Sequence, residues 1–133
     1  MLRLAVIMAG LASPIGAQTL CDTLDTLDGA ALELAHGTAD CTDSLALGGA
    51  RNIHCVLAYP YRSVDATRVF DALVDEVTAC VGLGASIIQD QSVNHPDAYD
   101  LRTFEGGTRQ YAVSIKDKGA LQQTLVFVRV TRP

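Results

Sequence analysis

The spacing of the four cysteines is the feature that most constrains how this chain can fold. Three of them, Cys41, Cys55 and Cys80, fall in a stretch that also holds the clearest turn and the clearest helical pattern. An even number of cysteines behind an export-like segment is typical of disulfides rather than of reactive thiols. A zinc site would need closely spaced ligand pairs, and the gaps here are long and irregular. We therefore expect two disulfides and no metal site at the cysteines.

A β-hairpin is predicted around Gly48 and Gly49, because glycines adopt the positive φ that tight hairpins need. Its strands are expected over residues 42–47 and 52–59. Side chains alternate along a strand, so one register places a largely apolar set on a single face of the sheet. That set comprises Cys41, Leu45, Leu47, Ile53, Cys55, Leu57 and Tyr59.

The same register sets Cys41 directly opposite Cys55. Opposed Cβ atoms lie about 4.5–5.5 Å apart, which is near the reach of a disulfide. We therefore expect a Cys41–Cys55 bridge, which leaves Cys21 to pair with Cys80. Four cysteines allow three connectivities, and this one depends on the hairpin register.

A helix is predicted to begin at Ser63, a natural N-cap, and to end at Gly82. The apolar residues Ala66, Val69, Phe70, Leu73, Val77 and Cys80 recur at helical spacing, so Cys80 is expected on the buried side. Residues 20–37 are ambiguous. Leucines at three-to-four spacing favour one helix that ends at Gly37, whereas Gly29 leaves open a short helix over 22–28 followed by a strand.

The C-terminal part reads as a three-stranded meander over residues 99–104, 108–116 and 121–130. A short strand over 85–88 is an additional option. The last strand contains a continuous apolar run, which predicts a central position buried on both faces. The fold class is therefore α+β: an antiparallel sheet of about five strands, formed by hairpin, helix and meander, with helices packed on one face. No βαβ alternation is present, which argues against a parallel nucleotide-binding sheet.

The N-terminus resembles a cleavable secretory signal. A short positive start is followed by an apolar run and by small residues, and cleavage is expected after Ala17, with a cut after Ala12 as the alternative. A retained anchor is disfavoured because the apolar run is far below the ~20 residues that a spanning helix needs. The expected organisation is a signal over 1–17 and one domain over 18–133, periplasmic or secreted, without a membrane span.

The charge of the chain is negative and unevenly distributed. The formal net charge is −5, and residues 18–50 contain no lysine or arginine. The acidic residues of this segment are Asp22, Asp25, Asp28, Glu33, Asp40 and Asp43. The sign argues against nucleic acid as a partner. The acidic segment is either a solvated face or a docking surface for a basic partner.

The loop over residues 89–98 and the start of the strand that follows it hold the candidate catalytic residues. His95 could act as a general base oriented by Asp97 or Asp100, with Ser92 as a nucleophile. Asp90, together with the same two aspartates, could instead bind calcium, although the spacing is not that of an EF-hand. A solvated turn, with Pro96 after the capping-type Asn94, is the favoured interpretation of this loop.

Two further groups are interpreted as surface features: His54, on the hairpin face opposite Cys55, and the charged tip 116–118, whose expected role is solubility. No cofactor motif is recognised. The leading hypothesis is a small exported, non-enzymatic domain that binds a protein or envelope component through one sheet face or the acidic segment. The alternatives are a small hydrolase or metal-dependent enzyme centred on His95, Asp97 and Asp100, and an envelope protein with a purely structural role.

Overall fold

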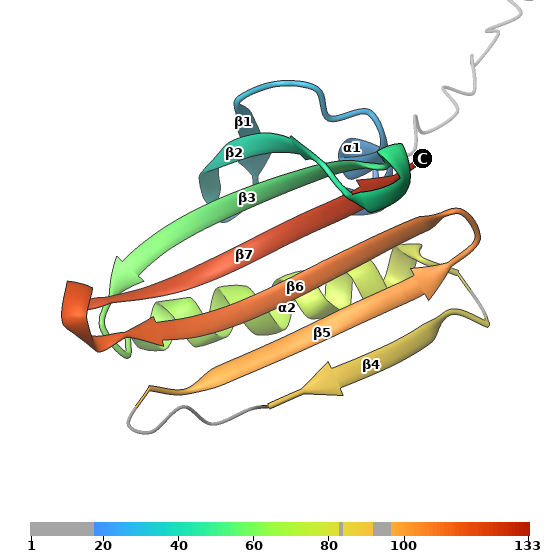
Figure 1. Cartoon of the computed structure of the whole chain (residues 1–133). Helices are drawn as coiled ribbons and strands as arrows, with labels where there is room; N and C mark the ends of the chain where they lie inside the picture. The colour runs from blue at the N-terminus through green and yellow to red at the C-terminus, as the bar shows by residue number, and fades with distance from the viewer. Residues whose placement is uncertain (1–17, 83, 92–96) are drawn as a thin grey trace, which may run out of the picture.

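The computed structural model describes residues 18–82, 84–91 and 97–133, which form one antiparallel sheet with helices on one side (Figure 1). The predicted signal, 1–17, lies outside the described residues. The helices are α1 (Leu20–Asp25) and α2 (Val64–Cys80), with 3₁₀ turns at Leu47–Gly49 and Gly119–Leu121. The strands are β1 (Ala31–Leu34), β2 (Gly37–Leu45), β3 (Arg51–Pro60), β4 (Ser86–Asp90), β5 (Tyr99–Gly106), β6 (Arg109–Lys118) and β7 (Gln123–Arg132).

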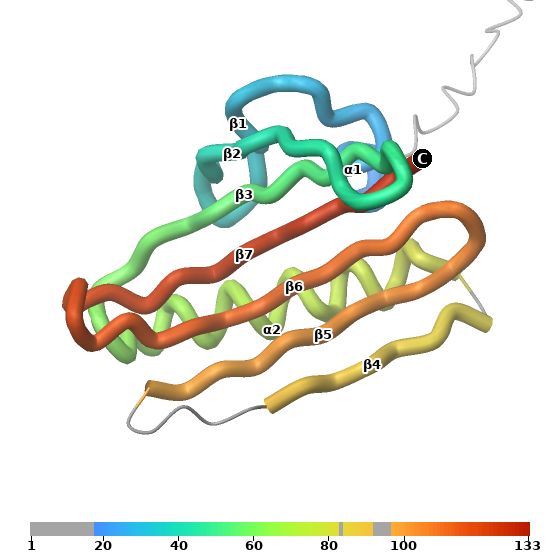
Figure 2. Tube along the Cα trace, in the orientation of Figure 1, coloured from blue at the N-terminus to red at the C-terminus, as the bar shows by residue number. Residues whose placement is uncertain are grey.

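The sheet has seven strands in the order β1-β2-β3-β7-β6-β5-β4. The antiparallel α+β class is therefore confirmed, but the predicted number of about five strands is too low. Chain tracing in Figure 2 shows how this order arises: after β3 the chain passes behind the sheet as α2 and re-enters at the far edge as β4. Four strands then return as a meander, so that β7 pairs with β3.

The hairpin of β2 and β3 has the predicted register, with Cys41 opposite Cys55. Gly48 and Gly49 both have a φ of 82°, which explains why glycines occupy the turn. The apolar face is shorter than predicted, however. Leu45 and Leu47 are 82% and 101% exposed, because they lie beyond the area that α2 covers and Leu47 belongs to the 3₁₀ turn.

Two disulfides link the elements. Cys41–Cys55 joins neighbouring strands over a sequence separation of 14 residues, and Cys21–Cys80 ties α1 to the end of α2 over a separation of 59. These are the pairs that the hairpin register favours. The second bridge encloses β1, β2, β3 and α2, so it fixes the N-terminal segment against the main helix.

Helix α2 supplies most of one layer of the core. Ser63 caps its first turn by accepting a hydrogen bond from the Asp65 amide at 3.1 Å, as the sequence predicts. Its buried residues are Ala66, Val69, Phe70, Leu73 and Val77. They pack on one face of the sheet against Ile53, Leu57, Phe104, Tyr111, Val113, Val126, Val128 and Val130.

The prediction of a single helix that ends at Gly37 is wrong. Helix α1 ends at Asp25, and residues 31–34 form strand β1, which is the alternative that Gly29 left open. The Arg132 side chain donates hydrogen bonds to the carbonyl oxygens of Leu24, Asp25 and Leu27. These carbonyls are thereby satisfied at the end of the helix, and the chain leaves the helical path.

The meander is confirmed, and it is longer than predicted. β4 extends to Asp90, into the segment that we expected to be a loop, and all its residues are exposed. β7 is the central strand, as the apolar run predicts, but it is not buried on both faces. Val126 and Val128 are buried under α2, whereas Leu125 and Phe127 on the other face are only half-buried.

Candidate binding site on the helix-free sheet face

The sheet presents one face that no helix covers within the described part of the chain, and this face points toward the viewer in Figure 1. Because side chains alternate, residues with even numbers on β3 and β6 and odd numbers on β7 belong to it. We call it the open face. On its central strands, His54 lies opposite Arg129, which in turn lies opposite Ala112.

Three cations gather on the open face without a carboxylate partner. Lys116 and Lys118 extend from β6 and Arg129 from β7, and among the described residues none of the three forms an ion pair with a carboxylate. The neighbouring Lys118 ammonium lowers the pKa of Lys116, because two adjacent positive charges repel each other. Positive charge is therefore concentrated here in a chain whose net charge is −5.

The other described cations have their charges engaged elsewhere. Arg51, Arg62, Arg68, Arg102 and Arg109 each pair with an aspartate, and Arg132 binds backbone carbonyls. The open face also carries Glu33, Asp40, Asp90 and Glu105 by strand alternation, but these lie on the outer strands β1, β2, β4 and β5. The cations without a carboxylate partner among the described residues thus lie on the inner strands β6 and β7 of one face, with Lys116 and Lys118 toward the end of β6.

A cavity of about 250 Å³ lies between these cations. Its lining includes all three cations and the side chains of Tyr99, Leu101, His54 and Phe127, and it contains no carboxylate. The Lys116 ammonium lies 5.9 Å from the centre of the Tyr99 ring, within the range of a cation–π contact. Aromatic floors with a few charged groups at the edge are typical of interaction surfaces.

His54 belongs to this cavity. Its ring stacks on Phe127 with the ring centres 4.8 Å apart and an interplanar angle of 18°. Partial burial and, secondarily, the nearby charge of Arg129 lower the pKa of His54, so the ring is neutral at pH 7. On its other side, the opposed β2 residue is the uncharged Thr42. His54 is exposed on the face opposite Cys55, as the hairpin pattern predicts, and it also lines this cavity.

The sequence contained a signal for part of this site. Alternation from Tyr111, Val113 and Ile115 places Ser114 and Lys116 on the outward face, but a charged tip by itself indicates no more than a role in solubility. The contribution of β3 was hidden, because it depends on the long-range pairing of β3 with β7.

The predicted catalytic loop is only partly described. His95 and Ser92 lie outside the described residues, so their roles stay predictions. Asp97 accepts hydrogen bonds from the Tyr61 hydroxyl at 3.0 Å and from the Gly119 amide at 3.2 Å.

Asp100 has a different set of partners. It pairs with Arg102 through Nε at 3.0 Å and through a second nitrogen at 3.2 Å, and it also accepts a hydrogen bond from Gln91 at 3.1 Å. The Asp97 and Asp100 carboxylates therefore bind different sets of neighbouring residues. Among the described residues, no cluster of three His, Cys, Asp or Glu side chains could hold a metal ion.

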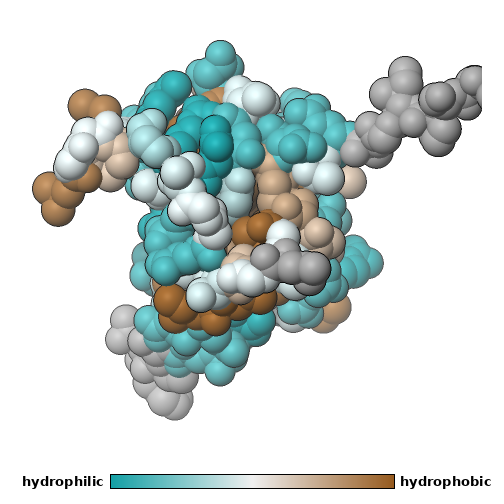
Figure 3. Space-filling view, turned by 90° about the vertical axis from the view of Figure 1, so that its right-hand side faces the viewer, coloured by the Kyte–Doolittle hydropathy of each residue, from teal (hydrophilic) through white to brown (hydrophobic). Residues whose placement is uncertain are grey.

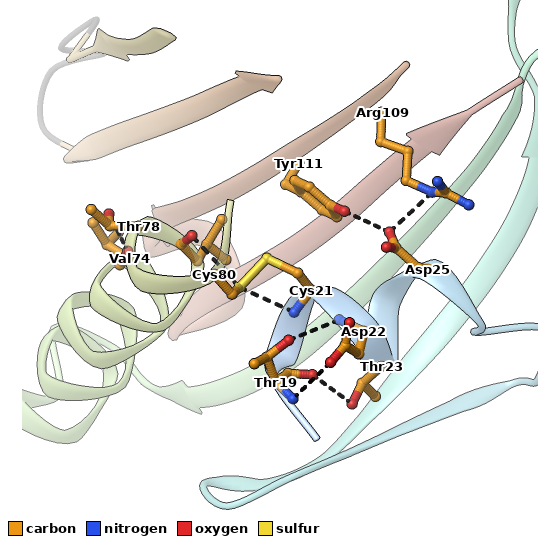
Figure 4. The surroundings of a disulfide bond; sticks show 11 residues. Thr19, Cys21, Asp22, Thr23, Asp25, Val74, Thr78, Cys80, Arg109 and Tyr111 are labelled. Carbon is orange, nitrogen blue, oxygen red and sulfur yellow. Dashed lines mark hydrogen bonds and ion pairs between the residues drawn. A yellow bond between two sulfur atoms is a disulfide. The ribbon is translucent and has the colours of Figure 1, made fainter. Parts of the chain in front are cut away.

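The acidic N-terminal segment is largely tied into the fold. Asp25 accepts a hydrogen bond of 2.5 Å from the Tyr111 hydroxyl and pairs with Arg109 at 3.1 Å, next to the Cys21–Cys80 bridge (Figure 4). Burial and this hydrogen bond raise the pKa of Tyr111 to about 12. Asp22 completes a capping box with Thr19 at the start of α1. These carboxylates therefore serve the structure.

The remaining surface offers weaker candidates. Large apolar side chains are exposed singly or in pairs: Leu45, Leu47, Val64, Ile87, Ile88 and Leu121. Figure 3 shows such apolar surface in separate patches among hydrophilic residues. A larger cavity, of about 590 Å³, lies between the turns at Gly48–Gly49 and Gly106–Gly107, but its arginines, Arg109 and Arg132, already hold α1 in place.

Within the described residues, no helix is both long and apolar enough to cross a membrane. Comparison with known proteins does not assign a family or a function to this site. No protein-family model matches the chain, and neither a curated protein nor a solved structure shows significant similarity to it.

Proposed function

We propose that the protein is a small exported, non-enzymatic binding domain whose open face binds an acidic segment of a protein partner. The observation that carries the proposal is that one cavity with an aromatic floor is lined by three cations that have no carboxylate partner among the described residues. Two disulfides are compatible with an oxidising compartment outside the cytosol. Complementary charge would steer the partner to this face, because the rest of the chain is predominantly acidic.

Reversing two charges on the open face is expected to weaken binding of an acidic probe. In Lys116→Glu/Arg129→Glu, two attractions of roughly 0.5 kcal/mol are each replaced by a repulsion of similar size. Affinity for a fluorescein-labelled oligo-glutamate peptide should therefore fall by about thirtyfold. Fluorescence anisotropy at low ionic strength measures this directly, because salt screens exposed charges.

The matched control is Arg51→Glu/Arg68→Glu, which changes the net charge equally. Both arginines are exposed and paired with aspartates away from the open face. This variant should retain the affinity of the wild type to within about threefold, because only the general field of the protein changes. An equal loss in both variants would mean that net charge, and not the open face, controls binding.

Binding is also expected to depend on pH through His54. Its pKa is lowered, so the ring is neutral at pH 7 and becomes a fourth cation only as the pH falls below about 6.5. A bound carboxylate favours the protonated ring, and by linkage the affinity for oligo-glutamate should rise on acidification toward about pH 5.5, where glutamate stays charged. The rise should be absent in His54→Gln. Identical pH profiles for the two proteins would contradict a role of His54 in the site.

A further inference from the structure

The spacing of the cations along the sheet restricts what the open face can bind. Arg129 is level with Ala112, its partner on β6, and Lys116 lies four residues further along the same strand. Side chains four residues apart in a strand point to the same face and are separated by about 13 Å. The strand positions that carry these two cations are therefore about 13 Å apart along the sheet, and Lys118 adds a further positive charge at the Lys116 end.

The surface between them is apolar and closely packed. Ser114 and Phe127 oppose each other midway between the two positive positions, and Leu101 lies next to Ser114 on β5. Ser114 is 9% exposed, so the midpoint offers little polar surface, and Phe127 is backed by the stacked ring of His54. A ligand that spans the cations must place an apolar group here.

We infer that the partner segment is an extended peptide with the pattern acid-x-apolar-x-acid. An extended chain has the same rise and alternation as the strands beneath it, so its residues i and i+4 lie about 13 Å apart on one face, with i+2 between them. The acids then meet Arg129 and Lys116, and the middle side chain covers Phe127. This inference rests on the proposed function and specifies the partner's sequence pattern.

The test compares three peptides of equal length in a serine-rich host. The first has glutamates at i and i+4 with phenylalanine at i+2. The second has the same composition with the second glutamate moved to i+3, where it points away from the sheet. The third replaces phenylalanine by serine. The first should bind about tenfold more tightly than the other two, because it alone engages both cations and the apolar midpoint. Phe127→Ala should abolish the advantage of the first peptide over the third, with circular dichroism verifying that the variant is folded.

The outcomes separate the two levels of the proposal. Equal, charge-dependent binding of all three peptides would overturn the spacing rule and leave the acidic-partner function intact. Absence of charge-dependent binding to every peptide and to oligo-glutamate would overturn both. A third outcome is that the protein binds vesicles of phosphatidylglycerol, that Lys116→Glu/Arg129→Glu does not, and that no peptide binds. The open face would then bind a membrane surface, and both the proposed function and the spacing rule would be overturned.

Discussion

Removal of the Cys21–Cys80 disulfide by the double substitution Cys21→Ala/Cys80→Ala is expected to lower the free energy of unfolding by about 4 kcal/mol. The bridge spans a sequence separation of 59 residues, and the loss of loop-closure entropy in the unfolded chain grows with the length of the enclosed loop. Urea denaturation of the oxidised proteins, followed by circular dichroism, measures the effect. Alanine avoids placing a hydroxyl group in the buried site of Cys21.

The matched control is removal of the other bridge by Cys41→Ala/Cys55→Ala. Its separation of only 14 residues predicts a smaller loss, of about 3 kcal/mol. The order of the two losses follows from loop length alone. A larger loss for the Cys41–Cys55 variant would show that packing around Cys55, and not loop closure, decides how much these disulfides stabilise the domain.

The second large effect is expected from Phe104→Ala. Phe104 is fully buried on β5 within the layer that packs against α2. Truncating a buried phenylalanine removes apolar contacts and leaves a cavity, which costs about 3–5 kcal/mol. Urea denaturation gives the value. Leu101→Ala on the same strand is the control: Leu101 is only half-buried on the open face, so its truncation should cost less than about 2 kcal/mol. Similar losses for both variants would mean that the core does not lie on the α2 side.

The local parts of the fold were predictable from the sequence. Cys41, Cys55 and the glycine pair between them fix a hairpin register that needs no information from the rest of the chain. Ser63 and the apolar spacing of α2 define a helix in the same way. These features depend on neighbours in the sequence, for which period and turn chemistry are direct physical constraints.

The remaining parts depend on tertiary contacts. Residues 31–34 become strand β1 by pairing with β2, while Arg132, more than a hundred residues away, satisfies the end of α1. The candidate site was missed for the same reason. Lys116 can be assigned to an outward face from alternation, but its grouping with Arg129 and His54 follows from the pairing of β7 with both β6 and β3. No local pattern encodes which strands are neighbours.

The most direct test of the central claim is a titration of the ¹⁵N-labelled protein with oligo-glutamate, followed by amide chemical shifts. The proposal predicts that the largest shifts cluster on β6 and β7, around Ser114, Lys116 and Phe127, and saturate together. Shifts that concentrate on α2 or on the acidic residues 22–43, or a spectrum unchanged at saturating peptide, would contradict a binding site on the open face.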